Sequence, residues 1–298
     1  MKNPHAASRP PTRALAYCAT AYVSALAVAV GAGYAARGLH PVIIVLIADI
    51  AGMLVIFAFG RMFRNASFYD PYWSVAPPVI ALYWVLGTAE GNADIMRQVL
   101  VVTLVFIWGL RLTGNWAGQW RGLAHEDWRY ADLRKKTGRW FPLVELVGIE
   151  LMPTLLVFLG CLSLYPALVT GYNPFGMLDV IAGIVTAGAI LIETASDIQL
   201  KRFSRGSRKS GVIMDKGLWA YSRHPNYFGE VLFWWGLFLF ALAAAPGYWW
   251  TVIGPTAITL LFFTVSIPLM EKRNVERRPG YAEHRVKTSA FFPWFRKA

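Results

Sequence analysis

Residues 41–60 read PVIIVLIADIAGMLVIFAFG, a run of apolar side chains in which Asp49 carries the only charge. A helix that crosses a bilayer needs about 20 consecutive residues of this kind. Lipid offers no hydrogen bonds, so the backbone has to satisfy its own polar groups, as a helix does. The stretch therefore predicts a membrane-spanning helix. Asp49 inside it is a candidate functional residue, because an ionisable group at that depth is costly.

Similar apolar runs recur along the chain. Of its 298 residues, 56% are hydrophobic and 15% are charged, whereas soluble domains average about 45–50% and about 25%. The sequence therefore predicts an all-α, polytopic transmembrane helix bundle of eight spans, or of seven if the last two runs form one broken helix. The expected spans are 14–36, 41–60, 72–88, 98–113, 142–168, 177–197, 227–245 and 248–269.

The basic residues predict the orientation of the bundle. With a cytoplasmic N-terminus and eight spans, 26 of the 29 Lys and Arg residues fall on the inner side, and Arg37 and Arg97 fall outside. Cytoplasmic loops carry such an excess, so both termini are expected in the cytoplasm, at a bacterial inner membrane or its equivalent. Topology and anionic lipid headgroups explain the net charge of +12. We expect no nucleic-acid partner, because no basic stripe with interleaved aromatic residues stands apart from the loops.

Metal-ligand patterns are missing from the sequence. The two cysteines, Cys18 and Cys161, lie far apart within apolar runs, and the five histidines have no ligand spacing such as H-x-x-x-H. The sequence therefore predicts no metal site and no disulfide framework.

Polar residues gather where the sixth expected span ends. Glu193, Asp197 and Lys201 are four residues apart and share one helix face. Arg202 and Arg205 follow in a segment rich in cations, hydroxyls and glycine. Such a segment is able to hold phosphates, although an ordinary positive-inside loop has a similar composition.

A second polar cluster precedes the seventh span. Pro225 is suited to the first turn of a helix, which places Asn226 and Glu230 on one face, a turn apart. Arg223 and His224 stand just before this helix N-terminus, whose free N–H groups favour an anion. The pattern indicates a site for an anionic ligand.

The stretch SRHPNYFGE at 222–230 resembles the C-terminal domain of the steroid 5-alpha-reductase family, and is similar to the related sterol C14- and delta-7-reductases. The tail strengthens the resemblance through EKRN at 271–274, PGYAEHR at 279–285 and FPW at 292–294. The resemblance covers about residues 190–298. It implies a C-terminal domain with a cofactor pocket at 141–298, preceded at 1–140 by transmembrane helices on the substrate side.

The resemblance implies an NADPH-dependent reductase that adds a hydride to the carbon–carbon double bond of an enone. A cluster of cations suits the 2′-phosphate and favours NADPH over NADH. The substrate is expected to be a steroid-like or other lipid-soluble small molecule that enters from the bilayer, and membrane lipids are the other expected partners. The expected cofactor-site residues are Glu193, Asp197, Lys201, Arg202, Arg205, Arg223, His224, Asn226, Tyr227, Glu230, Asn274, Tyr281 and Arg285.

The catalytic residues are harder to assign. The steroid reductases place a Glu and a Tyr in their N-terminal helices, and neither aligns with this chain. The nearest candidates are Tyr69 and Asp70, with Tyr72 and Trp73 beside them, and Asp49. A buried neutral Asp or Tyr is able to donate a hydrogen bond to a developing enolate. Alternatively, Asp70 caps the next helix and the aromatic residues form an interfacial belt.

Two other functions remain open. S-Adenosylmethionine-dependent methyltransferases, such as those acting on isoprenylcysteine carboxyl groups, also have an R-H-P-x-Y-x-G stretch. They typically end the later helix with two Glu, whereas Lys272 follows Glu271 here, and Glu230 directly follows the glycine. A non-catalytic lipid binder is the third hypothesis. The sequence does not indicate an oligomeric state.

Overall fold

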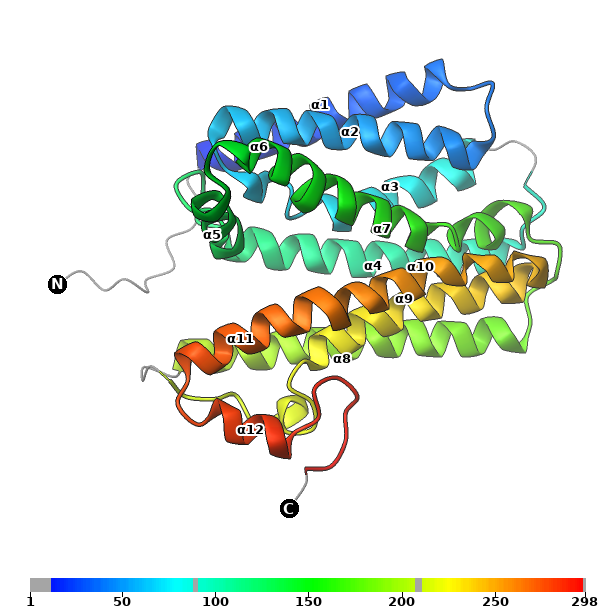
Figure 1. Cartoon of the computed structure of the whole chain (residues 1–298). Coiled ribbons are helices and arrows are strands. Elements are labelled where there is room, and N and C mark those ends of the chain that lie inside the picture. Colours follow the sequence, from blue (N-terminus) through cyan, green and yellow to red (C-terminus); the bar gives the residue numbers. More distant parts are fainter. Residues whose placement is uncertain (1–11, 88–90, 207–210, 297–298) are drawn as a thin grey trace. The chain divides into compact units, whose positions relative to one another are not determined.

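A computed structural model describes residues 12–87, 91–206 and 211–296. Within these ranges the chain folds into helices and forms no strand (Figure 1). The α-helices are α1 (Thr12–Ala35), α2 (Pro41–Phe63), α3 (Tyr72–Gly87), α4 (Ile95–Gln119), α5 (Trp128–Thr137), α6 (Phe141–Val144), α7 (Met152–Cys161), α8 (Met177–Gly206), α9 (Pro225–Ala244), α10 (Ile253–Leu261), α11 (Ile267–Arg277) and α12 (Tyr281–Lys287). The 3₁₀-helices are η1 (Ala66–Phe68), η2 (Gly138–Trp140), η5 (Gly217–Ala220) and η6 (Pro246–Val252), and the π-helices are η3 (Glu145–Leu151), η4 (Pro166–Thr170) and η7 (Phe262–Ser266).

Seven helical segments among the described residues are long and apolar enough to cross a membrane. They are Thr12–Ala35, Pro41–Phe63, Ile95–Gln119, Trp128–Thr170, Met177–Gly206, Pro225–Ala244 and Pro246–Arg277. Helix α3 is also apolar, but it has only 16 residues and contains Pro77 and Pro78. The predicted all-α bundle of seven or eight spans is confirmed.

The outer surfaces of the helices are apolar. Val23, Ile184 and Leu191 are each more than two-thirds exposed, although they lie in the middle of long helices. Such side chains have a suitable solvent in lipid but not in water. The chain is therefore an integral membrane protein. The cytoplasmic placement of its termini stays a prediction, and residues 1–11 lie outside the described ranges.

The chain divides into two compact units. Unit 1 comprises residues 1–91 and 105–165, and unit 2 comprises residues 92–104 and 166–298. Helix α4 therefore contributes its first turns to unit 2 and the rest to unit 1. The functional division that we expect, with substrate-side helices at 1–140, stays a prediction.

In unit 1, small residues let helices approach closely. A Cβ on Gly52 would lie 2.9 Å from the hydroxyl of Tyr72, so only glycine leaves room for that contact. A Cβ on Gly109 of α4 would lie 2.6 Å from the carbonyl oxygen of Ser74 in α3. The hydroxyl of Tyr22 in α1 donates to the carbonyl of Phe68, 2.9 Å away. The last contact holds the loop after α2 against α1, and the two glycines bring α2 and α4 close to α3.

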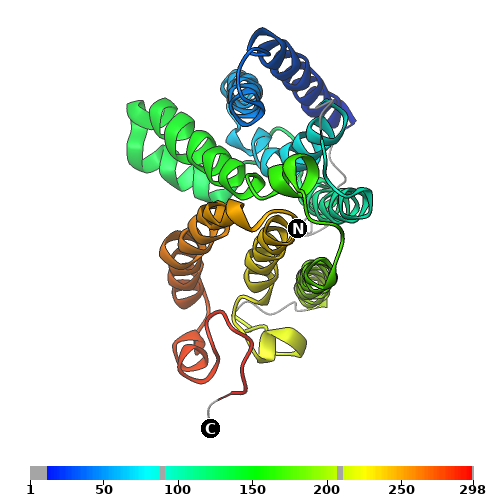
Figure 2. The same cartoon turned by 90° about the vertical axis from the view of Figure 1, so that its right-hand side faces the viewer.

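In unit 2, α8 and α9 run side by side, with α10 along α9 (Figures 1 and 2). Gly229 makes this close packing feasible, because a Cβ there would lie 2.8 Å from the Cβ of Glu193. The first turns of α4 join the unit through Arg97, which is fully buried and pairs with Asp179 of α8.

Candidate functional site

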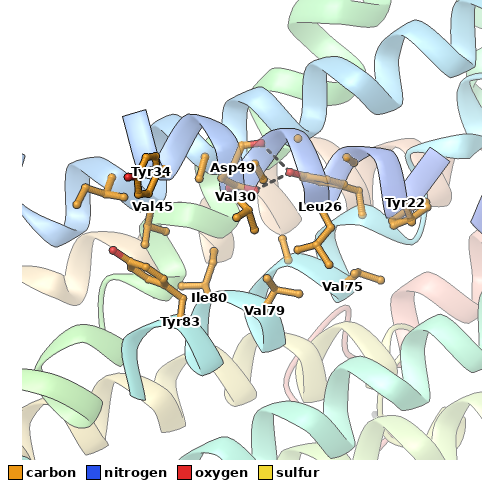
Figure 3. A pocket seen from close by; sticks show the side chains of 18 of the residues that line it. Tyr22, Leu26, Val30, Tyr34, Val45, Asp49, Val75, Val79, Ile80 and Tyr83 are labelled. Carbon is orange, nitrogen blue, oxygen red and sulfur yellow. Dashed lines mark hydrogen bonds between the residues drawn. The ribbon is translucent and has the colours of Figure 1, made fainter. Parts of the chain in front are cut away.

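Unit 1 contains a cavity of about 370 Å³ between α1, α2 and α3 (Figure 3). Small-molecule sites usually enclose roughly 300–1,000 Å³ and are lined mainly by apolar side chains, and this cavity fits both criteria. Leu26, Val30 and Val79 on its wall are also exposed on the outer surface of the helices. The cavity therefore opens towards the surface that we assign to lipid.

The polar groups on the cavity wall include Asp49 and Tyr72. The Tyr72 hydroxyl lies 2.9 Å from Oδ1 of Asp49 and 2.6 Å from its carbonyl oxygen, and it donates to them. Oδ2 of Asp49 is buried and has no hydrogen-bond partner among the described residues. A carboxyl group with one oxygen fixed and one oxygen uncommitted is suited to bind the polar group of an otherwise apolar ligand.

The other two predicted catalytic residues lie behind this wall, and neither lines the cavity. Tyr69 is 2% exposed, its hydroxyl lies 2.9 Å from Oγ1 of Thr154, and its ring stacks on that of Tyr72. Oδ1 of Asp70 accepts a 2.6 Å hydrogen bond from Tyr130. Burial raises the pKa of Asp70 to about 6, although Arg129 and the Tyr130 hydrogen bond act against this shift. Of the three residues, the structure places only Asp49 against a ligand-sized space.

In unit 2, four of the predicted cofactor residues meet at Glu271 of α11, which is 5% exposed. Nε and Nη2 of Arg223 bind its two carboxylate oxygens at 2.7 and 3.0 Å. Nε2 of His224 lies 3.1 Å from Oε1, and Nε of Arg285 lies 2.7 Å from Oε2. Tyr281 donates to Oε1 across 3.2 Å, and burial raises its pKa to about 12, so it remains a neutral donor.

The remaining donors of Arg223 bind the C-terminal segment. Its Nη1 donates to the carbonyl oxygens of Arg285 and Thr288, and its backbone N–H donates to Ser289. Because Arg223 directly precedes His224 and α9, this clamp holds the tail against the start of that helix. The geometry gives Arg223 a structural role, and its contact with a cofactor stays a prediction.

A second polar group lies where α8 meets α9. Glu193 packs against Gly229, and Glu230 is 4% exposed and accepts a 2.8 Å hydrogen bond from the indole of Trp234. One turn earlier on α9, the side-chain oxygen of Asn226 is buried without a hydrogen-bond partner in the described part of the chain. An amide oxygen of this kind is available to a ligand hydroxyl or amide.

The cations that the sequence groups with this cluster lie at the end of α8. Lys201 is partly buried, whereas Arg202 and Arg205 are exposed. Asp197 lies one turn from both Glu193 and Lys201. The two arginines are accessible to an anion, whereas Asn226 lies partly buried in the first turn of α9.

The last two predicted cofactor residues lie beside the Glu271 cluster. The ring of Tyr227 stacks on that of His224, with 5.2 Å between their centres. The side-chain oxygen of Asn274 accepts a 2.8 Å hydrogen bond from Arg278. Both residues help to shape the start of α9 and the end of α11.

Sequence reasoning did not identify Glu271 as a centre. The signal was a single acid at the end of the last apolar run, immediately before a basic tail. An acid at that depth requires partners. Arg223 and His224 precede Glu271 by 48 and 47 positions, and Arg285 follows it in the tail, so no local pattern groups them.

A family model described as "Protein of unknown function (DUF1295)" matches residues 56–288. An uncharacterized protein of Schizosaccharomyces pombe is 26% identical over 277 residues, and the match covers 82% of this chain and 79% of that protein. No solved structure matches the chain.

Proposed function

This chain belongs to the DUF1295 family, and we propose that it is a membrane-embedded, NADPH-dependent reductase of a carbon–carbon double bond conjugated to a carbonyl in a lipid-soluble substrate. The observation that carries the proposal is the Asp49–Tyr72 pair on the wall of an apolar cavity. The resemblance of residues 190–298 to the steroid 5-alpha-reductase family supports the cofactor and the reaction.

The cavity suits a largely apolar substrate with one polar group. Its volume of about 370 Å³ and its apolar wall favour a rigid lipid. If Asp49 carries a proton on Oδ2, this atom is able to donate to a carbonyl oxygen while Tyr72 holds Oδ1. A donor aimed at the oxygen where negative charge develops stabilises the enolate that hydride addition forms.

The residues of unit 2 fit the polar parts of a nicotinamide cofactor. The uncommitted oxygen of Asn226 is suited to a carboxamide or a ribose hydroxyl. Arg202 and Arg205 are exposed cations suited to phosphate. When bound, NADPH would supply the hydride, and the chain would supply alignment and a proton donor. We place this unit's polar end at the cytoplasmic face of a bacterial inner membrane, because the basic loops lie there in the predicted topology.

The test is ligand binding by the detergent-purified protein. A ligand that binds only the folded state raises the melting temperature by mass action. We expect NADPH to raise it more than NADH does, and S-adenosylmethionine to leave it unchanged. Asn226→Ala removes one ligand contact of about 1–1.5 kcal/mol and should weaken NADPH binding about tenfold. Glu283→Gln, at an exposed carboxylate, is the control.

The second stage measures NADPH oxidation with a panel of lipid-soluble enones. Asp49→Asn and Tyr72→Phe should lower the turnover and leave NADPH binding intact, because they lie in the other unit. If S-adenosylmethionine alone stabilises the protein, the reductase proposal is wrong and the methyltransferase hypothesis replaces it. If neither NADPH nor S-adenosylmethionine binds, both enzyme proposals lose their support and lipid binding is measured next.

A further inference from the structure

The π-helix η3 (Glu145–Leu151) carries two acids that the proposed reaction does not use. Glu145 and Glu150 are both 0% exposed. They are five residues apart, which in an α-helix would turn them to different sides. A π-helix closes its hydrogen bonds between residues i and i+5, so residues five apart return to the same side. The π-turn therefore aligns the two carboxyl groups, and such turns are frequent at functional sites.

The two carboxyl groups converge on a space above Gly60 of α2. A Cβ built on Gly60 would lie 3.6 Å from Oε1 of Glu145 and 3.8 Å from Oε1 of Glu150. It would also lie 3.4 Å from the carbonyl oxygen of Asn65. Three oxygens thus lie within van der Waals distance of one point.

The charges of this group do not balance. Oε2 of Glu145 accepts from Arg61, 3.1 Å away, but Oε1 of Glu145 and both oxygens of Glu150 have no hydrogen-bond partner among the described residues. Two ionised carboxylates and one guanidinium leave one uncompensated negative charge. A buried charge without a partner is strongly unfavourable, so we expect one more positive charge at this site.

A proton fits this space better than a metal ion. Hard cations take about six or more oxygen ligands, whereas three oxygens converge here. The described residues also contain no group of three or more His, Cys, Asp or Glu side chains arranged to hold a metal. A proton needs only one carboxyl group to carry it and one oxygen to accept its hydrogen bond.

We propose that Glu145 and Glu150 bind one exchangeable proton between them at neutral pH. Arg61 favours the ionised form of Glu145, so the proton resides on Glu150 and is directed to the uncommitted oxygen of Glu145. The two acids form a proton-binding site inside the bundle. The inference rests on burial, hydrogen bonding and helix geometry, and it does not depend on the proposed reductase activity.

Other polar groups lie on either side of this site. Thr154 lies one turn after Glu150, and its Oγ1 is 2.9 Å from the hydroxyl of Tyr69. Tyr69 stacks on Tyr72, the partner of Asp49. At the other end the side chain of Arg61 is 38% exposed. The titratable and charged groups that act on the two acids are Arg61, Tyr69, Asp70, Glu126 and Arg134. Within the proposed reduction, the site would be a source from which the proton at Asp49 is restored.

Infrared spectroscopy of the purified protein tests the proposal directly, because a protonated carboxylic acid has a carbonyl band separate from those of carboxylates and amides. We expect such a band at neutral pH. Glu150→Gln should remove it. Glu145→Gln should also remove or strongly weaken it, because the single remaining carboxylate then balances the charge of Arg61 without an added proton. Glu283→Gln should leave it unchanged, and Asp49→Asn separates any contribution of Asp49.

Several outcomes overturn the proposal. One is the absence of a protonated-acid band other than the one removed by Asp49→Asn. Another is a band that survives unchanged in both Glu variants. A third comes from the melting temperature of the protein, which is compared in NaCl, KCl and choline chloride at equal ionic strength. A rise specific to Na⁺ or K⁺ that Glu150→Gln abolishes would mean that a metal cation, and not a proton, balances the charge.

Discussion

Replacing Glu271 with Gln removes the charge at the centre of the unit 2 cluster and keeps the shape of the side chain. Arg223 is 9% exposed and binds both carboxylate oxygens. The variant leaves this guanidinium buried without its anion, and breaking a buried ion pair costs about 3–5 kcal/mol. Arg285 adds little, because its side chain is half exposed and such pairs contribute about 0–1 kcal/mol.

The loss can be measured as a melting temperature in detergent. At roughly 2–4 °C per kcal/mol, we expect a fall of about 10 °C. Glu276→Gln on the same helix is the matched control, because Glu276 is exposed. Surface substitutions usually change stability by no more than about 0.5 kcal/mol. Equal melting temperatures for the two variants would refute the assignment of Glu271 as the centre of a buried cluster.

Hydrogen exchange gives a second, local readout. The bonds from the Arg223 guanidinium to the carbonyls of Arg285 and Thr288 depend on Glu271, which holds that group in place. We therefore expect faster exchange over residues 281–296 in Glu271→Gln, with little change in unit 1. Arg223→Lys should behave similarly, because a lysine keeps the charge but lacks the planar fork. Unchanged exchange in the tail would contradict the clamp.

Two further predictions concern single charged groups. Arg97→Ala should destabilise the protein by about 3–5 kcal/mol, because Asp179 is 1% exposed and would lose its partner. The double variant Arg97→Met with Asp179→Leu should restore most of the melting temperature. A double variant whose loss of stability equals the sum of the two single losses would contradict the pairing. The pKa of Asp70 is about 6 in the folded protein and about 3.9 in an unfolded chain, so the folded state binds this proton more tightly. The stability from protonated Asp70 should be present in full below about pH 4 and be lost as the pH rises towards 6. Asp70→Asn should flatten this part of the melting-temperature profile, and a profile identical to that of the wild type would exclude Asp70 as its cause.

The spans were predictable because their length and apolarity follow from the thickness of the bilayer. The run expected at 41–60 forms α2 (Pro41–Phe63), and the run expected at 177–197 begins α8 (Met177–Gly206). Helices α8 and α11 end at residues 206 and 277, whereas the expected spans end at 197 and 269. Helical turns with charged residues continue beyond each apolar run. The π-helix at Glu145–Leu151 was not predictable from the spacing of hydrophobic residues, because one wide turn changes that spacing over only a few positions.

Pairs of charged residues were predictable only where the two partners are close in the sequence. Arg97 fell on the outer side of the predicted topology as an exception, and the structure explains it by a 2.6 Å contact with Asp179. These two residues are 82 positions apart, so no local pattern connects them. Asp49 was recognisable from its position in an apolar run. Glu145 and Glu150 carry the same signal inside the expected span 142–168, but only the π-turn reveals that their side chains lie on one side of the helix.

Hydrogen-bond satisfaction separates the polar residues that build this protein from those that are available to act. Glu271 accepts from Arg223, His224 and Tyr281, and a buried acid with so many donors is most simply structural. Asp49 and Glu150 differ, because each is buried and keeps an oxygen without a partner in the described residues. Native structures leave few such groups, and each one requires an explanation. We propose a ligand at Asp49 and a proton at Glu150 as that explanation, and each is tested by a substitution that changes one carboxyl group to an amide.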